Sequence, residues 1–266
     1  MLIKNNFHES EVPAAPAAGS VIHRADGSTE HVSGPVIAEH FIEISVNGRL
    51  VARLTCTPRD LTGLVLGRLL TEGIIDGTED VRRIFICGRG DIAEVELSRE
   101  AEFDDALFAE PTCCTGSRQF LTKKGGRSLE RLGGKAVRGG VDPSAVFELA
   151  GRFAEDSRLH ASTGGTHSCI LRAPDGSIHR YEDVSRHNAL DKAVGCMLLQ
   201  DYEPSGCMLF TSGRVAADMA VKAIASGIPV LISKAVPTDE ALRLARDHGL
   251  TLIARAWPDS YVTYES

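Results

Sequence analysis

The chain has 266 residues, a hydrophobic fraction of 43% and a charged fraction of 24%, which are the proportions of a folded globular protein and exclude a wholly disordered chain. Its net charge of −7 and aromatic content of 5% argue against general binding to nucleic acid. No stretch approaches 18 consecutive apolar residues and the start lacks the apolar core of a secretory signal, so we expect no membrane segment and a cytoplasmic location.

The N-terminal part is predicted to be rich in β-structure. Residues 1–33 are polar with an Ala/Pro run, and we expect a flexible or loosely packed arm there. Residues 40–56 alternate apolar and polar side chains around Asn47-Gly48, a pattern typical of a hairpin. A helix is predicted over residues 61–75, with Asp60 or Thr62 as its N-cap and Gly73 at its end. A strand pair is predicted to follow, at residues 82–88 and 91–98.

The C-terminal part is predicted to alternate strands and helices. One amphipathic helix is expected over residues 143–160, with Ser144 as its N-cap, and two strands around the turn Pro174-Asp175-Gly176. A helix at residues 186–200 follows Ser185. The next elements are strand 206–212, helix 212–227 entered through Ser212, strand 228–235, helix 238–249 capped by Pro237 and Thr238, and strand 250–256.

Short links between these last elements require right-handed crossovers and a parallel sheet segment. The sequence therefore predicts an α/β fold with an antiparallel contribution from its front half. We expect three parts: the arm at residues 1–33, a β-rich part at residues 34–125, and an α/β part at residues 126–266.

Two of the seven cysteines lie in a setting that suits chemistry. Cys113 and Cys114 lie in a polar loop of small residues near Arg118, and a reactive thiol needs exposure and a neighbourhood that favours the thiolate. The alternative is a pair of incidental loop thiols. An odd number of cysteines and the lack of a Cys-x-x-Cys pair argue against a disulfide framework and a zinc ribbon. The zinc-deaminase signature is also missing, so no metal site is expected.

Polar residues also cluster at predicted junctions between strands and helices. Ser212-Gly213-Arg214 and Thr238 lie where anions bind in open α/β sheets, and the alternative is a capping serine with a solvated arginine. Residues 182–192 either line a pocket or form a buried capping and salt-bridge cluster. His167, at the start of a strand, is a ligand-binding candidate or a structural histidine.

These segments resemble the FdhD family of formate dehydrogenase accessory proteins, from about Glu43 to the C-terminus. The resemblance is carried by TPRDLTGLVLGRLLTEGII, GGTHSC, YEDVSRHNALDKAVG and residues 212–254. It implies a cytidine-deaminase-like α/β core without zinc, with a parallel or mixed sheet flanked by helices, and a homodimer. It also implies a sulfur carrier that accepts persulfide sulfur from a cysteine desulfurase. The sulfur then passes to the molybdenum or tungsten bis-molybdopterin guanine dinucleotide cofactor of formate dehydrogenase.

The resemblance assigns the persulfide to Cys113 or Cys114. Relatives usually read Cys-Gly-x-Cys-Gly in this loop, whereas this chain reads CCTGSR, and an ungapped register favours Cys113. The usual Arg-Gly-x-Arg segment of the tail is replaced by one that keeps Arg255. These departures leave two alternatives: a chaperone that binds the cofactor or a guanine nucleotide without sulfur transfer, and a catalytically silent paralogue. The residues expected to bind the cofactor are His167, Glu182, Asp183, Arg186, His187, Asn188, Asp191, Lys192, Ser212, Gly213, Arg214, Thr238 and Arg255.

Overall fold

The computed structural model describes residues 1–9, 14–16, 19–99, 141–155 and 157–264. A five-stranded sheet forms the N-terminal half, in the order β1-β8-β9-β6-β7. Its strands are β1 (Leu2–Asn5), β6 (His40–Val46), β7 (Arg49–Cys56), β8 (Val81–Ile86) and β9 (Ile92–Leu97). The predicted hairpin at residues 40–56 is confirmed, since Asn47 and Gly48 both have positive φ, at 50° and 78°, as a two-residue hairpin turn requires.

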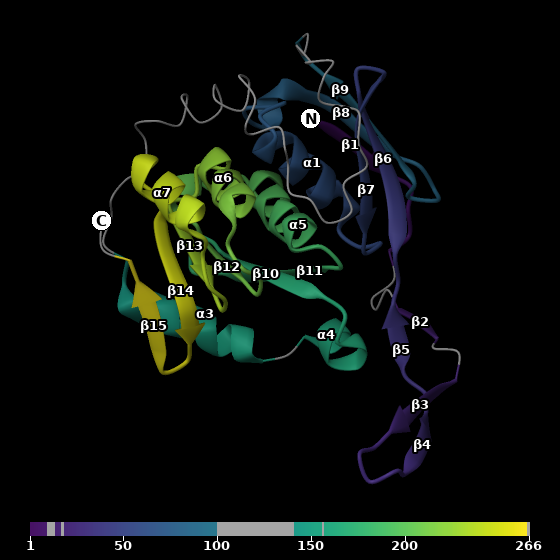
Figure 1. Cartoon of the computed structure of the whole chain (residues 1–266). Helices are drawn as coiled ribbons and strands as arrows, with labels where there is room; N and C mark the ends of the chain where they lie inside the picture. The colour runs from purple at the N-terminus through teal and green to yellow at the C-terminus, as the bar shows by residue number, and fades with distance from the viewer. Residues whose placement is uncertain (10–13, 17–18, 100–140, 156, 265–266) are drawn as a thin grey trace.

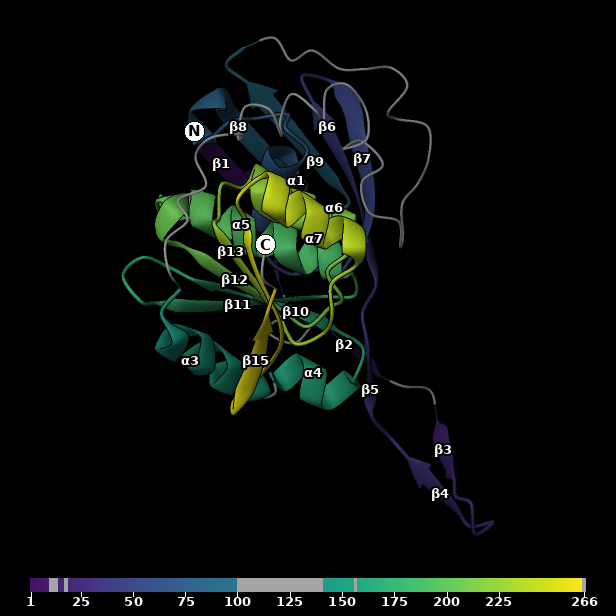
Figure 2. The ribbon, with the colours of Figure 1, turned by 60° about the vertical axis from the view of Figure 1, so that its left-hand side comes forward.

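The segment expected to be an arm contributes to this sheet at its start. Strand β1 pairs in parallel with β8, so residues 2–5 belong to the body of the protein. Two small ladders follow, β2 (Ala14–Pro16) with β5 (Pro35–Ile37), and β3 (Ser20–His23) with β4 (Thr29–Val32). Figures 1 and 2 show the β3–β4 hairpin extending away from the rest of the chain.

A six-stranded sheet forms the C-terminal half, in the order β11-β10-β12-β13-β14-β15. Strands β12, β13 and β14 run parallel, which confirms the predicted parallel segment. The outer pairs are antiparallel, so the sheet is mixed. Its strands are β10 (His167–Arg172), β11 (Ile178–Asp183), β12 (Met208–Thr211), β13 (Val230–Ser233), β14 (Thr251–Trp257) and β15 (Ser260–Thr263).

Helices cover both faces of this second sheet, as the α/β class predicts. Helices α5 (Arg186–Leu199), α6 (Ala217–Ala225) and α7 (Asp239–Asp247) lie on one face, and α3 (Pro143–Ala154) and α4 (Arg158–Thr163) lie on the other (Figures 1 and 2). Helix α1 (Leu61–Thr71) packs between α5 and the first sheet. Short 3-10 turns are formed by Thr78–Asp80 and Pro204–Gly206. Among the described residues, no helix is long and apolar enough to cross a membrane.

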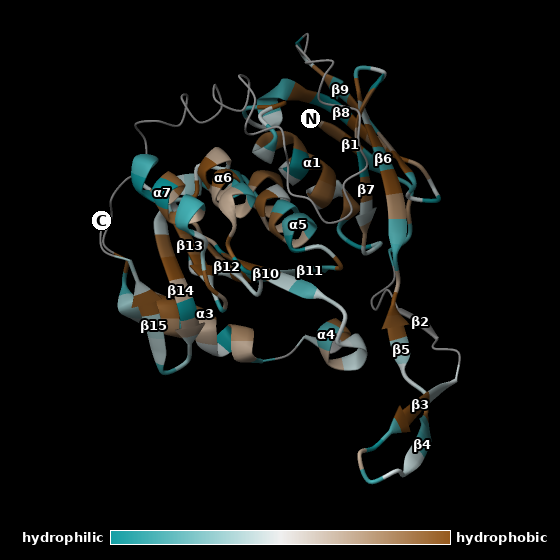
Figure 3. Cartoon of the chain, viewed as in Figure 1, coloured by the Kyte–Doolittle hydropathy of each residue, from teal (hydrophilic) through white to brown (hydrophobic). Residues whose placement is uncertain are grey.

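One hydrophobic core joins the two sheets. It includes Ile44 and Val95 of the first sheet, Leu66 of α1, Leu190 of α5 and Leu209 of the second sheet, all of them buried. Figure 3 shows apolar residues concentrated on the strands and on helices α1 and α5. A second, smaller cluster packs α3 against the opposite face of the second sheet.

Glycines allow the backbones of α1 and α5 to touch. A Cβ atom on Gly67 would lie 1.8 Å from the backbone oxygen of Asp191, and one on Gly195 would lie 1.9 Å from the backbone oxygen of Gly63. No side chain fits at either distance. The charged motif at the start of α5 is therefore held directly against α1.

The helix predicted at residues 143–160 differs from the structure in its start and in its length, and both differences have a local reason. Asp142, not Ser144, caps α3, because its carboxylate accepts a hydrogen bond from Ser144 N at 2.9 Å and Pro143 occupies the first helical position. The region predicted as a single helix at residues 143–160 contains two, with Ser157 capping α4.

The helix expected to begin at Ser212 begins at Ala217 instead. Val215 pairs with the extension of β13, accepting from Thr238 N and donating to Val236 O, and this bridge keeps the preceding segment extended. Helix α7 starts as predicted, with the Thr238 hydroxyl accepting from Ala241 N. Asp60 precedes α1, but its side chain makes no capping hydrogen bond there; the carboxylate of Glu9 accepts from Asp60 N and Leu61 N.

Candidate functional site

Several predicted site residues meet at the edge of the second sheet where β12, β13 and β14 end. Ser212 directly follows β12, and its hydroxyl accepts from Ser168 N at 3.1 Å and lies 3.2 Å from His167 Nδ1. Because β10 runs antiparallel to β12, the start of β10 lies beside the end of β12, which places His167 at this edge. Carboxyl ends of parallel strands are where open α/β sheets bind ligands.

Arg186 closes one side of this edge. It is the first residue of α5, and a Cβ atom on Gly213 would lie 2.9 Å from its Cδ, so the glycine lets the arginine stem lie flat against the turn. The Nε atom of Arg186 is buried and has no hydrogen-bond partner in the described part of the chain. A buried donor of this kind is uncommon in a folded protein and is suited to an acceptor from a ligand.

Arg255 reaches the same edge from β14. Its φ of 47° lies in the left-handed region, where a non-glycine residue is strained by roughly 1–2 kcal/mol. The strain coincides with a register shift between β14 and β15, and Arg255 N donates to Ala235 O at 3.0 Å. The side chain is left exposed beside the end of β13.

A row of cations results. Arg186 is the first residue of α5, Arg214 and Lys234 come after the ends of β12 and β13, and Arg255 lies near the end of β14. Within the described residues, none of the four forms an ion pair. Four cations that have no carboxylate partner among the described residues give this sheet edge a local positive field in a protein of net charge −7. Such an edge can bind a phosphorylated anion.

Two histidines lie at or directly beneath this edge and form polar contacts there. Burial, and next the charge of Arg186, lower the pKa of His167 below its ordinary value, so its imidazole is neutral at neutral pH and can donate or accept one hydrogen bond. His187 Nε2 lies 2.9 Å from Asp218 Oδ2. Burial alone would raise the pKa of Asp218, but the hydrogen bond and charge of His187 outweigh it and hold this pKa below its ordinary value. The pair ties α5 to α6 directly beneath the edge.

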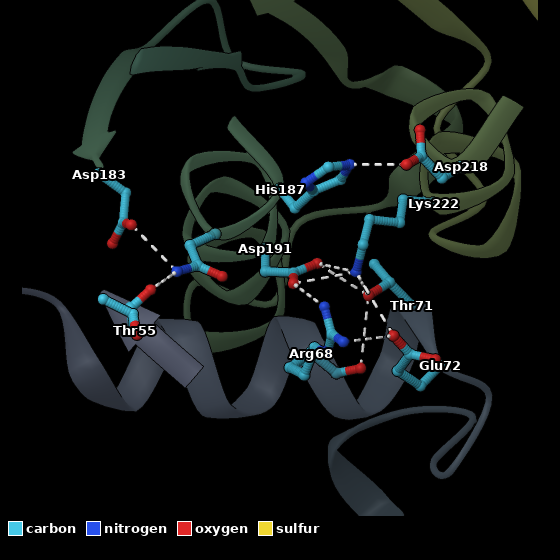
Figure 4. A network of polar contacts seen from close by, with 10 residues as sticks. Thr55, Arg68, Thr71, Glu72, Asp183, His187, Asp191, Asp218 and Lys222 are labelled. Atoms are coloured by element: carbon cyan, nitrogen blue, oxygen red, sulfur yellow. Dashed lines mark hydrogen bonds and ion pairs between the residues drawn. The ribbon is translucent and has the colours of Figure 1, made fainter. Parts of the chain in front are cut away.

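A second link joins the same helices one turn further along. Lys222 donates to both carboxylate oxygens of Asp191, at 2.8 and 2.9 Å, and both side chains are fully buried (Figure 4). Thr71 donates to Asp191 Oδ1 at 2.8 Å, and Arg68 lies 3.0 Å from Glu72 and 3.5 Å from Asp191. Burial lowers the pKa of Lys222, while Asp191 opposes that effect. The cluster connects α1, α5 and α6.

A third buried pair fixes α5 to the first sheet. Lys192 Nζ lies 2.7 Å from Asp183 Oδ2 and donates to the backbone oxygens of Thr57 and Glu182, each at 3.1 Å. Asp183 also accepts from Thr57 N and from Asn188 Nδ2, each at 3.0 Å. All hydrogen-bonding needs of this pair are met inside the protein.

Most of the predicted site residues thus fall into two groups. His167, Arg186, Ser212, Gly213, Arg214 and Arg255 lie at the cationic edge. A second group is buried and hydrogen-bonded within the protein, as the alternative of a buried capping and salt-bridge cluster predicted, and it positions the start of α5: Asp183, Asn188, Asp191 and Lys192. His187 lies between the groups; Thr238 is used as a helix cap, and Glu182 accepts from Ser157 and Thr166.

Sequence reasoning missed Asp218 and Lys222. They are four residues apart on α6 and face His187 and Asp191, which are four residues apart on α5. Residues four apart share one helix face. A lysine inside the apolar run AVKAIA, one turn after an aspartate, was the available signal.

The described thiols are poorly placed for sulfur chemistry. Burial raises the pKa of Cys56 and Cys207 to about 12 and also raises those of Cys169 and Cys196. Cys87 is half-buried and donates to Asp91 Oδ1 at 2.9 Å. Cys113 and Cys114 lie outside the described residues. Among the residues described, no three His, Cys, Asp or Glu side chains are grouped to hold a metal ion.

Comparisons with known proteins agree with the features above. A sequence profile of the FdhD/NarQ family matches residues 37–266. The protein named sulfur carrier protein FdhD from Geobacillus kaustophilus is 33% identical over 238 residues, which are 87% of this chain and 89% of that one. Its namesake from Shouchella clausii is 31% identical over 232 residues, 85% of this chain and 86% of that one. The crystal structure of a protein assigned as a formate dehydrogenase accessory protein, from Desulfotalea psychrophila, matches with a TM-score of 0.76 and 25% identity, covering 95% of this chain and 97% of that one.

Proposed function

Because this chain belongs to the FdhD/NarQ family, we propose that it is a sulfur carrier that supports formate dehydrogenase activity. The observation that carries the proposal is the row of cations beside His167 and Ser212, none of which is ion-paired within the part of the chain that the structure describes, since a sulfur carrier has to hold the anionic cofactor that receives the sulfur. Burial raises the pKa of four described thiols, and Cys87 donates a hydrogen bond to Asp91, which favours the loop thiols as carriers: the four are Cys56, Cys169, Cys196 and Cys207.

The sulfur-accepting step is assigned to Cys113 or Cys114. A cysteine desulfurase presents sulfur as a persulfide, and the loop thiolate attacks its outer sulfur. The S–S bond breaks, the desulfurase thiolate leaves, and a persulfide remains on the carrier without net oxidation. Release of that sulfur as hydrosulfide requires a second thiolate, which attacks the inner sulfur of the persulfide. The terminal S–S bond breaks, a disulfide forms between the two thiols, and their oxidation supplies the two electrons.

The client ligand is proposed to be the molybdenum or tungsten bis-molybdopterin guanine dinucleotide cofactor, held at the cationic edge. Arg186 and Arg214 suit its phosphates, because a guanidinium donates two parallel hydrogen bonds to a phosphate. Ser212 and His167 supply neutral hydrogen-bonding groups between the two arginines. A homodimer and a cysteine desulfurase are the proposed protein partners.

Mass spectrometry of the intact protein and its peptides tests the carrier function. After incubation with an active desulfurase and cysteine, we expect one additional sulfur on the peptide that contains Cys113 and Cys114, removable by reductant. The variants Cys113→Ala and Cys114→Ala assign it to one thiol, and Cys87→Ala serves as the matched control that retains it. A double Cys113→Ala/Cys114→Ala variant that still activates formate dehydrogenase would contradict the assignment.

The departure of CCTGSR from the family's loop favours one second candidate, a cofactor chaperone without sulfur transfer. In that case no sulfur is added to the peptide although the desulfurase is active, and a guanine nucleotide still binds.

A further inference from the structure

A cavity of about 400 Å³ lies between α3 and the hairpin of β10 and β11 (Figure 2). Ile170 and Ile178 form an apolar floor, and both contribute to the smaller hydrophobic cluster of the second sheet. The cavity is distinct from the cationic edge, because it lies at the other end of β10. His167 begins this strand at the edge and Arg172 ends it beside the cavity, roughly 17 Å away along the strand.

Arg180 fixes one wall of this cavity. It lies on β11 opposite Ile170 of β10, on the face of the sheet that α3 covers. Its guanidinium donates to the backbone oxygens of Arg152 and Glu155 at the end of α3, and it lies 5.7 Å from the ring centroid of Phe153. These contacts satisfy carbonyl groups that the end of a helix leaves free, and they hold α3 against β11. Arg180 is therefore a structural part of the wall.

Two carboxylates and two guanidinium groups surround the cavity without bonding closely to one another. On α3, Arg152 Nη1 lies 4.0 Å from Glu155 Oε2, and these side chains are 60% and 71% exposed. Glu148, one turn before Arg152, lies 3.6 Å from Arg172 Nε. Both distances exceed that of a hydrogen bond. Within the described residues, neither guanidinium donates a hydrogen bond, and Arg172 Nε is buried.

An α-amino acid presents the complementary set of groups. Its carboxylate suits the free donors of Arg152 and Arg172, since a guanidinium donates two parallel hydrogen bonds to a carboxylate. Its ammonium group suits the two glutamates, and an apolar side chain would cover the two isoleucines of the floor. A ligand that is only anionic would meet the glutamates, and one that is only cationic would meet the arginines, so like charges disfavour both.

We propose that this cavity binds a free α-amino acid with an apolar side chain. Arg152 and Arg172 hold its carboxylate, Glu148 and Glu155 hold its ammonium group, and the floor receives its side chain. This site is separate from the cationic edge and goes beyond the sulfur-carrier function, on which it does not depend.

A ligand-observed NMR titration of the full chain with L-leucine tests the site. We expect saturable binding with a Kd of about 1 mM or below. Three analogues each lack one of the recognised groups: 4-methylpentanoate lacks the ammonium group, isopentylamine lacks the carboxylate, and glycine lacks the side chain. Each analogue should bind at least about 10-fold more weakly than L-leucine.

Two exposed positions on α3 allow matched variants. Arg152→Gln and Glu148→Gln should each weaken L-leucine binding by about 5- to 20-fold, because each removes one charged partner of the ligand. The control is Arg243→Gln on α7, whose side chain is 55% exposed and is also paired with a glutamate three residues away. It should leave the affinity unchanged. A melting temperature equal to that of the wild type shows that each variant is folded.

Any of three results would overturn the proposal: no saturable binding of L-leucine, equal affinity for an analogue that lacks a charged group, or the same loss of affinity in Arg243→Gln as in Arg152→Gln. These titrations need neither a desulfurase nor the loop cysteines, and persulfide formation is measured separately by mass spectrometry. Failure of the amino-acid site is therefore distinguishable from failure of the sulfur-carrier function.

Discussion

Replacing Lys222 by methionine should destabilise the protein by removing one charge from a balanced buried cluster. In the wild type, the cations Lys222 and Arg68 oppose the carboxylates Asp191 and Glu72, and the lysine and Asp191 are fully buried. Lys222→Met leaves two carboxylates and one arginine, which is one uncompensated negative charge. Breaking a buried ion pair in this way costs about 3–5 kcal/mol of the free energy of unfolding.

The expected change is large enough for thermal unfolding. An unfolding entropy of about 2.1 cal/mol/K per residue gives roughly 0.56 kcal/mol/K for 266 residues, so the melting temperature should fall by about 5–9 °C. The measurement is circular dichroism or calorimetry on the full chain. As a control, Arg243→Met removes an exposed partner of Glu240 and Asp247 and should give no measurable shift.

A second variant separates lost charge balance from lost packing. In Lys222→Met/Asp191→Asn the remaining pair, Arg68 with Glu72 at 3.0 Å, is neutral overall. The double variant should therefore recover at least half of the stability lost in Lys222→Met. A double variant less stable than Lys222→Met, or a single variant with the wild-type melting temperature, would refute the reasoning.

Three further predictions concern packing, pH and thiol reactivity. Gly67→Ala should lower the free energy of unfolding, measured by urea titration, by more than about 3 kcal/mol, because the added Cβ meets the α5 backbone. Gly151→Ala in α3 has open space around the added Cβ and should raise the free energy of unfolding by about 0.5–1 kcal/mol. The pKa of His167 is lower in the folded than in the unfolded protein, so the unfolded state binds the proton more readily. The difference in free energy of unfolding between the wild type and His167→Gln should therefore shrink as pH falls below 6.5. A difference that stays constant with pH would show that His167 does not titrate as described. Iodoacetamide at neutral pH should leave the four buried thiols of the native protein unmodified, namely Cys56, Cys169, Cys196 and Cys207. Labelling of any of these thiols without unfolding would contradict their burial.

Local features of the fold were predictable from sequence because their signals are local. Asn-Gly at residues 47–48 has few alternatives to a tight hairpin turn, and Thr238 before two acidic residues is a strong helix start. The helix expected at Ser212 failed for a non-local reason. Its first residues are held extended by the bridge from Val215 to Pro237, a contact that depends on the order of strands in the sheet.

The candidate site was predictable as a set of residues but not as an arrangement. The sequence showed a dense polar segment before and within α5. It did not show that Arg186 lies at the surface while Asp183 and Asp191 form buried ion pairs with lysines. That separation depends on how α1 approaches α5, which is decided by glycine contacts between segments far apart in the sequence, Gly67 with Asp191 and Gly63 with Gly195. Lys234 and Arg255 lie side by side at the edge only because β13 and β14 are neighbours.

The glycine contact between α1 and α5 also bears on how the protein meets its partners. Helices whose backbones touch cannot slide or rotate past one another, so the start of α5 and the arginine it carries keep one orientation whether or not a ligand is present. The conformational entropy of ordering this part of the proposed binding surface is therefore lost when the chain folds rather than when a ligand binds. Preorganisation of this kind favours affinity for one ligand shape over adaptability to several.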